Sequence, residues 1–246
     1  MSHFDSHCHL NHPLFMARPE SVRANMRRHQ VSKVLVPATR LADWPEMLTL
    51  PTLYPEQTIL FALGIHPYFL PSDLAGALQT LADMLNDATI KAKLHAVGEI
   101  GLDFVDKQQP EAVKSAQLTL FRAQVALAQA HQLPIVLHST HAVQQCLTDL
   151  KAQQFSYGGY AHAFGGSIEQ AKQMIDLGFK IGIGPMIYHP KAKKFKELVK
   201  NIPMSDLAFE TDAPYPIRNP MDLNHLNMPG NVAKVAEVAH ALRNDS

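Results

Sequence analysis

Imidazole and carboxylate side chains recur at the ends of short apolar runs in this sequence. The first run is "FDSHCHL", residues 4–10, in which Asp5, His7 and His9 alternate along the chain. Four later runs carry the others: "GEIGLD" has Glu99, "VLHST" has His138, "YAHAF" has His162, and "FETDAP" has Glu210 and Asp212. An ionisable group inside an apolar strand is costly unless it is paired or bound to a metal. The joint pattern therefore predicts a site that holds divalent metal ions and activates water.

The prediction depends on the whole set, because each member alone is weak evidence. Histidine fills 14 of 246 positions, so a His-x-His pair arises readily by chance. A lone His138 or His162 is more often a hydrogen-bonded core residue, and a lone Glu99 can pair with a lysine. Three or more neutral imidazoles with carboxylates suit zinc, manganese or nickel, and carboxylates with water also suit magnesium. The sequence does not distinguish among these four metals.

Eight runs of strand length can position these side chains. They recur along the whole chain and mostly end in turn residues, at 3–10, 33–39, 58–67, 95–103, 134–140, 158–164, 179–185 and 207–214. Helical patterns lie between them, with apolar faces over 118–128, 143–150, 168–175 and 232–242. Ser167 and Gln170 fit a capping box at the start of the third helix, and Gly178 fits its end. The segment 41–57 contains three prolines and is the poorest helix candidate.

Strands that alternate with helices form parallel β-α-β units. Eight such units in 246 residues predict an α/β fold, a (β/α)8 TIM barrel, rather than an open doubly wound sheet. No linker-like composition or charge block divides the chain, which predicts a single domain over residues 1–246. No Gly-x-Gly-x-x-Gly motif opens the first helix, which argues against dinucleotide binding. Active sites of such barrels lie at the C-terminal ends of the strands, where the imidazoles and carboxylates are expected.

The composition limits the partners and the location of the protein. Lys and Arg number 22, as do Asp and Glu, so no global field attracts a polyanion and any nucleic-acid contact must be a local patch. The two cysteines, Cys8 and Cys146, offer no disulfide framework. We expect no signal peptide and no membrane span, because the N-terminus is polar and no apolar run is long enough. The expectation is a cytoplasmic protein that is a monomer or a weak homo-oligomer.

With these residues in place, the chain resembles the TatD family of metal-dependent hydrolases, within the amidohydrolase-type barrels. The motifs that carry the resemblance are "FDSHCHL", "GIHP" (64–67), "VGEIGLD" (97–103), "LHS" (137–139), "HAF" (162–164) and "ETDAPY" (210–215). The resemblance implies deoxyribonuclease activity on phosphodiesters, often from a 3′ end.

The resemblance also implies a site with two divalent metal ions. One ion would be held by His7, His9, Glu99 and Asp212, and the other by Glu99, His138 and His162, with Glu99 as the bridge. On physical grounds, Asp212 could both bind an ion and take the proton of the attacking water. The resemblance places His66 against the substrate phosphate, although a histidine that orders the turn before Pro67 explains this residue equally well.

Three features depart from the family's pattern. Thr140 stands where many members have an arginine after "LHS", and Tyr68 stands where many have a second histidine after "GxHP". Many members also continue beyond the last barrel helix, whereas this sequence stops at residue 246. Basic residues that could contact a DNA backbone are Arg218 and the run 191–200, although a solvated helix face is the better explanation of the run.

Other functions use the same predicted site. A metallohydrolase of a small ester, amide or lactone, or of an ester at a tRNA 3′ end, is the main alternative, and Thr140 with the neutral charge favours it. Many barrels of the wider group carry a carboxylated lysine where this chain has Glu99, which counts against that alternative. A barrel that only binds, without catalysis, is disfavoured because all six expected ligands are present.

Overall fold

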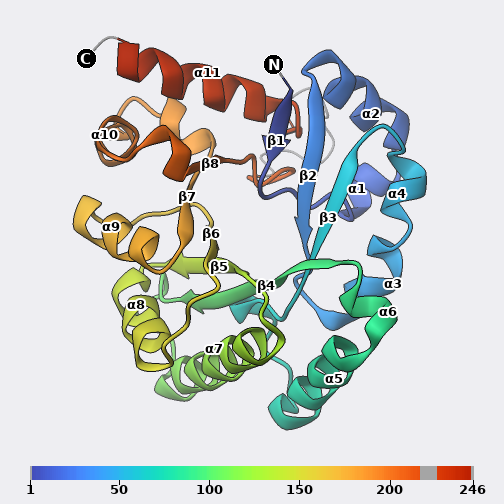
Figure 1. Cartoon of the computed structure of the whole chain (residues 1–246), viewed down its shortest axis with the longest axis vertical. Coiled ribbons are helices and arrows are strands. Elements are labelled where there is room, and N and C mark those ends of the chain that lie inside the picture. The colour runs from blue at the N-terminus through green and yellow to red at the C-terminus, as the bar shows by residue number, and fades with distance from the viewer. Residues whose placement is uncertain (1, 217–225, 245–246) are drawn as a thin grey trace. The chain divides into compact units, whose positions relative to one another are not determined.

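The computed structural model describes residues 2–216 and 226–244. Within these residues eight strands form one sheet in the order β1-β2-β3-β4-β5-β6-β7-β8. The strands are β1 His3–Asp5, β2 Val31–Pro37, β3 Thr58–Leu63, β4 Leu94–Asp103, β5 Ile135–Thr140, β6 Gly159–Ala161, β7 Phe179–Ile183 and β8 Leu207–Phe209 (Figure 1). Parallel pairing joins β1 to β2, and it joins each strand from β3 to β6 to the strand that follows it. Sequential order with parallel pairing confirms the predicted (β/α)8 class.

Helices follow the strands, and each of the four predicted apolar faces lies within a helix. The longer ones are α2 Pro19–Arg28, α5 Leu74–Asn86, α7 Glu111–His131, α8 Val143–Ala152, α9 Ile168–Asp176, α10 Lys193–Asn201 and α11 Asn231–Asn244. The capping box of α9 is present, because Ser167 Oγ accepts from the Gln170 amide while Gln170 Oε1 accepts from the Ser167 amide. No helix in the described ranges is both long and apolar enough to cross a bilayer.

The proline-containing segment forms only single helical turns, as its composition predicts. These are the 3-10 turn Leu41–Asp43, α3 Trp44–Met47 and α4 Leu50–Leu53. Two further short α-helices are α1 Pro13–Met16 and α6 Ala88–Lys91, and other 3-10 turns lie at Pro67–Phe69, Pro185–Tyr188 and Met204–Asp206. Proline lacks the amide proton that a longer helix would need at each turn.

The contacts of the chain divide it into two compact units. Unit 1 consists of Met1–Val36, Pro45–Leu60 and Gly182–Ser246, and unit 2 consists of Pro37–Trp44 and Phe61–Ile181. The single domain remains a prediction.

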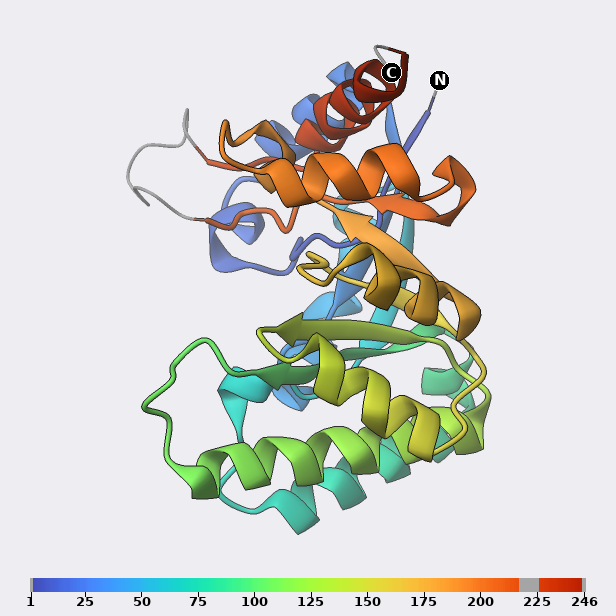
Figure 2. The same ribbon diagram turned by 90° about the vertical axis from the view of Figure 1, so that its left-hand side faces the viewer.

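In unit 1 the last strand lies beside the first. The Ser6 amide just after β1 donates to the Phe209 carbonyl of β8 at 3.0 Å, and Cys8 forms a parallel bridge with Ala213. Helices α10 and α11 pack against each other, and α11 also contacts β1 and β8 (Figures 1 and 2). The segments that follow β1 and β8 are therefore neighbours although they are far apart in the sequence.

In unit 2 the long helix α7 packs along β4 and fixes two loops through buried glutamine side chains (Figure 2). Gln124 Oε1 accepts from the Ile65 amide at 2.8 Å, and its Nε2 donates to the Ile65 carbonyl at 3.1 Å. Gln117 Oε1 accepts from the Asp103 amide at 2.9 Å. Both glutamines are buried, so these bonds hold the residue before His66 and the end of β4 in place without competition from water.

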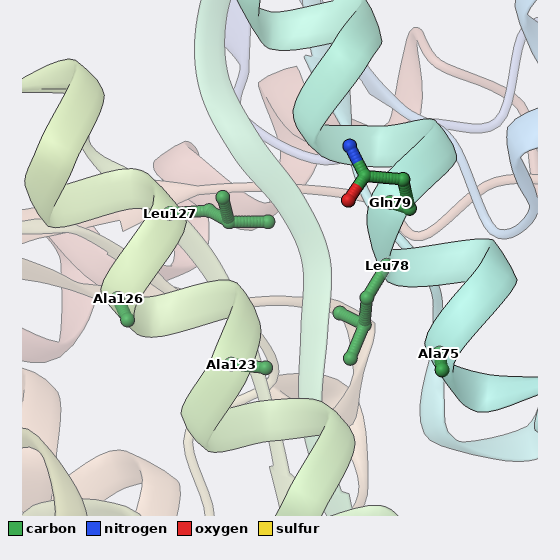
Figure 3. Close-up of a pocket in the computed structure, with 6 residues that line it drawn as sticks. All are labelled: Ala75, Leu78, Gln79, Ala123, Ala126 and Leu127. Atoms are coloured by element: carbon green, nitrogen blue, oxygen red, sulfur yellow. The ribbon is translucent and has the colours of Figure 1, made fainter.

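An apolar groove lies between α5 and α7 on the helix layer of unit 2. Its volume is about 400 Å³, and it is lined by Ala75, Leu78, Gln79, Ala123, Ala126 and Leu127 (Figure 3). Since no ionisable side chain lines it, this groove is not a candidate for hydrolytic chemistry.

Candidate metal centre

The two histidines of "FDSHCHL" lie just beyond the end of β1. The strand stops at Asp5, earlier than the predicted residue 10. The chain nevertheless stays bonded on both sides, because the Cys8 amide donates to the Leu35 carbonyl at 3.1 Å and the His9 amide donates to the Ala213 carbonyl at 2.8 Å. Cys8 is a fully buried free thiol that alternates with the histidines.

Three ligand atoms converge in unit 1. The Nε2 atoms of His7 and His9 lie 3.3 Å apart. Asp212 Oδ1 lies 3.4 Å from Nε2 of His9 and 3.7 Å from Nε2 of His7. Both histidines are buried, whereas 35% of the Asp212 side chain is exposed. Two imidazoles and a carboxylate at these separations fit a divalent metal ion, so the donor set matches the chemistry predicted from the sequence.

Asp5 does not join this group, although its spacing places it in register with the histidines. Its fully buried carboxylate accepts from the His7 amide at 3.3 Å, from the Thr211 amide at 3.0 Å and from Thr211 Oγ1 at 2.6 Å. Thr211 Oγ1 in turn accepts from the Ala213 amide at 3.1 Å. Burial raises the pKa of Asp5 well above its usual value, and the bonds from Thr211 and His7 oppose that rise. This brace joins the end of β1 to the segment that carries Asp212.

The backbone at Asp212 has an uncommon conformation. Its φ of +55° lies in the left-handed region, which Asp adopts more readily than most residues. The Asp212 amide donates to the His7 carbonyl and its carbonyl accepts from the Tyr215 amide, both at 2.8 Å. These two bonds hold the turn that presents the carboxylate to the histidines.

A second convergent group lies in unit 2, around Glu99 of β4. Glu99 Oε1 is 3.0 Å from Nδ1 of His138, which belongs to β5, and 3.6 Å from Nε2 of His66. Glu99 and His66 are buried, and the three residues together could hold a metal ion. His162 follows β6, and its ring centroid lies 6.4 Å from that of His138. The structure therefore places His66 against the same carboxylate oxygen as His138; its expected contact with the substrate phosphate stays a prediction.

The glycine between the two acidic residues of β4 is required by close strand approach. Gly101 has a φ of +148°, and a Cβ there would lie 1.8 Å from the His138 carbonyl oxygen. Any side chain would therefore push β4 and β5 apart at the level of His138. This explains why Glu99 and Asp103 flank a glycine rather than another apolar residue.

Asp103 is a site residue that the sequence analysis missed. Its Oδ2 lies 2.8 Å from Nε2 of His138, and its Oδ1 accepts from the Val105 amide at 3.0 Å. Burial raises the pKa of Asp103, but the hydrogen bonds from His138 and Val105 outweigh burial and hold this pKa below its usual value. Strand alternation could have identified it, because Asp103 is four residues after Glu99 and so faces the same side.

The two carboxylates give His138 a strong affinity for positive charge. Burial by itself lowers the pKa of this imidazole, but the hydrogen bonds with Asp103 and Glu99 raise it to about 9. A cation beside Nδ1, whether a proton or a metal ion, is therefore stabilised at this position.

Comparison with known proteins now places the chain in a family. The family model described as TatD related DNase matches residues 4–246. The chain belongs to this family. An uncharacterized metal-dependent hydrolase of Escherichia coli, YjjV, is 35% identical over 246 residues, which cover 98% of this chain and 90% of the relative. The human deoxyribonuclease TATDN3 is 29% identical over 217 residues, covering 85% and 77%.

A solved structure agrees with the family assignment. The crystal structure of the TatD homologue YjjV from E. coli matches with a TM-score of 0.85 at 32% identity, covering 98% of this chain and 90% of that one. The family and the fold predicted from the sequence are thus both confirmed, and the chain is a TatD-type metal-dependent hydrolase.

The positions that depart from the family's pattern lie beside the unit 2 group. The Tyr68 amide donates to Nδ1 of His66 at 3.1 Å, and its ring centroid is 6.2 Å from that of His138. Burial and a hydrogen bond with Asp103 raise the pKa of Tyr68. Thr140 pairs with Asp103 across β4 and β5. Arg218, a predicted substrate-binding residue, lies outside the described residues.

Proposed function

We propose that this TatD-type hydrolase is a deoxyribonuclease that cleaves phosphodiester bonds, from the 3′ end of DNA. The observation that carries the proposal is the pair of imidazole–carboxylate groups, His7–His9–Asp212 and His66–Glu99–His138, at the C-terminal ends of the strands. The relatives named deoxyribonucleases support a nucleic-acid substrate.

The proposed ligand set is the one that the family resemblance implies. His7, His9, Glu99 and Asp212 would hold one divalent ion, and Glu99, His138 and His162 the other, with Glu99 as the bridge. The donor chemistry supports zinc, manganese, nickel or magnesium. Such ions, when bound, supply Lewis acidity that brings the pKa of water towards neutrality and stabilise the charge of the phosphate.

We assign Asp212 the role of proton acceptor. Its carboxylate is the part of the unit 1 group that solvent reaches, whereas His7 and His9 are buried. One oxygen can hold a cation beside the histidines while the other accepts the proton of the attacking water. The turn bonds at Asp212 keep the carboxylate oriented for both tasks.

A second candidate function keeps the site and changes the substrate. A small ester, amide or lactone, or an ester at a tRNA 3′ end, needs less positive charge around the site than a DNA strand does. Thr140 in place of an arginine and the zero net charge favour this candidate.

A substrate panel distinguishes the two candidates. Protein stripped with a chelator and reloaded with each of the four metals is tested on 5′-labelled single-stranded DNA, bis(4-nitrophenyl) phosphate and small carboxylic esters. The proposal expects stepwise shortening of DNA that is lost on stripping and restored on reloading. Turnover of esters without turnover of either phosphodiester would support the second candidate, and full activity of metal-free protein would contradict both.

We also propose that the protein works in the cytoplasm as a monomer or a weak homo-oligomer. Cys8 and Cys146 are buried free thiols, which suits a reducing compartment.

A further inference from the structure

An arginine and a phenylalanine form an exposed pair next to the unit 2 metal-binding group. Arg40 lies just after β2, and Phe69 ends the 3-10 turn Pro67–Phe69 that follows His66. The guanidinium carbon of Arg40 lies 4.8 Å from the centroid of the Phe69 ring. The Phe69 ring centroid is in turn 6.0 Å from that of His66, whose Nε2 contacts Glu99. The pair is therefore two side-chain contacts from the carboxylate of the candidate metal centre.

The backbone around Arg40 is firmly held. Asp43 Oδ2 accepts from the Arg40 amide at 2.9 Å, and from the amide and hydroxyl of Thr39 at 3.1 and 2.9 Å. The Thr39 carbonyl accepts from the His66 amide at 3.0 Å. The loop that carries Arg40 is thus tied to the loop that carries His66, so the backbone from which the guanidinium extends has a defined place relative to the His66 loop.

The side chain of Arg40 is nevertheless open to solvent, with 58% of its surface exposed. Its Nε lies 3.5 Å from Asp43 Oδ1, and this is the one acidic contact that the structure gives Arg40 within residues 2–216 and 226–244. A contact at Nε occupies one edge of the guanidinium and leaves the two terminal nitrogens for a ligand. Stacking on an aromatic ring orients this planar cation before a ligand binds, which reduces the entropy lost on binding.

We propose that Arg40, supported by Phe69, binds a phosphate of the substrate strand adjacent to the phosphate that is cleaved. The chemistry fits, because a guanidinium offers two parallel N–H donors that match a phosphate, and because aromatic stacking is a property of arginine more than of lysine. The inference rests on the proposed function for the class of substrate. It adds a binding residue from a loop that none of the sequence motifs includes.

The test measures binding separately from catalysis. Chelated protein is titrated with a fluorescein-labelled oligothymidylate of eight nucleotides, and anisotropy gives Kd at several salt concentrations. Arg40→Ala should raise Kd about tenfold and reduce the slope of log Kd against log salt by about one. Phe69→Leu should raise Kd as well, whereas Phe69→Tyr, which keeps the aromatic ring, should have the Kd of the wild type.

Arg122→Ala is the matched control. Arg122 lies on α7 of the same unit, is 52% exposed and pairs with Asp149 through its Nε, as Arg40 does with Asp43. This variant should bind the oligonucleotide like the wild type. Thermal unfolding of all variants identifies any that fail to fold, and Arg40→Lys, which keeps the charge but not the planar fork, should give an intermediate Kd.

Kinetics with two substrates separate this inference from the proposed function. Arg40→Ala should raise KM for the oligonucleotide. It should leave kcat and KM for bis(4-nitrophenyl) phosphate unchanged, because that substrate has only one phosphate. If the wild type hydrolyses neither substrate but binds DNA through Arg40, the proposed function fails and the binding residue stands. If the wild type does not bind the oligonucleotide, or Arg40→Ala binds it equally well, the inference is overturned.

Discussion

Asp103 and Glu99 contact the two different ring nitrogens of His138, at 2.8 Å from Nε2 and 3.0 Å from Nδ1 respectively. When Nε2 donates its proton to Asp103, Nδ1 presents a lone pair on the side of Glu99. The hydrogen bond therefore selects the tautomer and fixes the ring in the orientation that a metal ligand needs. In the proposed ligand set, Asp103 would thus position His138 without being a ligand itself.

Asp103→Asn should weaken metal binding about 10- to 100-fold, because the amide no longer holds His138 in its orientation by a charged hydrogen bond. Competition with a chromophoric chelator measures the metal Kd. Asp106→Asn serves as control, since Asp106 is an exposed residue of the next loop whose carboxylate accepts from the Gln108 amide. Equal metal affinity in Asp103→Asn and the wild type would contradict the positioning role.

Glu99→Gln should lower the content of both metal ions, whereas His138→Ala should mainly lower one. The reason is that the proposed ligand set uses Glu99 twice and His138 once. Elemental analysis after identical loading and desalting gives the metal-to-protein ratio of each variant. A ratio in Glu99→Gln that equals that of the wild type would rule out the bridge.

Asp212→Asn should reduce kcat by at least about 10²-fold, in the range of a lost general base, while substrate Kd and stability change little. The amide keeps the shape of the side chain but does not accept the proton as a carboxylate does. Single-turnover rates of fully metal-loaded protein make the comparison. Near wild-type turnover would mean that the base lies elsewhere, and loss of metal binding would mean that Asp212 is primarily a ligand.

Thr211→Val should lower the free energy of unfolding by about 1–3 kcal/mol, because it removes a hydrogen bond to the buried carboxylate of Asp5 and leaves that carboxylate short of a donor. Thr211→Ser, which keeps the hydroxyl, should recover most of the loss. Denaturant unfolding of metal-free protein provides the measurement. Thr148→Val is the control, since the Thr148 hydroxyl bonds a helix carbonyl at the surface. A Thr211→Val protein as stable as this control would show that the brace contributes little.

Much of the fold could be predicted because the strands alternate with amphipathic helices along the whole chain. Each of the eight predicted runs overlaps one strand, and α9 begins and ends where Ser167 and Gly178 indicate. The strand ends were less predictable. Residues such as His9 lie beyond β1 but still form backbone hydrogen bonds with a neighbouring segment. Their sequence pattern is therefore typical of a strand although the strand has ended.

The candidate site was only partly predictable, for a related reason. Alternation along a strand indicates which way a side chain faces, but it does not show which residue or ion that side chain will bind. Asp5 faces the right way for a ligand yet bonds Thr211, and Asp103 faces the right way yet was not recognised as the partner of His138. Gln124, which holds the Ile65 backbone, has no signal in the sequence beyond a polar residue on a helix.

The brace between Asp5 and Thr211 has a consequence for biosynthesis. The two residues are 206 positions apart, so His7 and His9 leave the ribosome long before the segment with Asp212 exists. At about 5–20 residues per second, this delay is roughly 10–40 s. During that time the nascent chain displays two histidines without their carboxylate partner. A product released before Thr211 is made cannot assemble the unit 1 group, so incomplete chains should lack hydrolytic activity rather than retain a part of it.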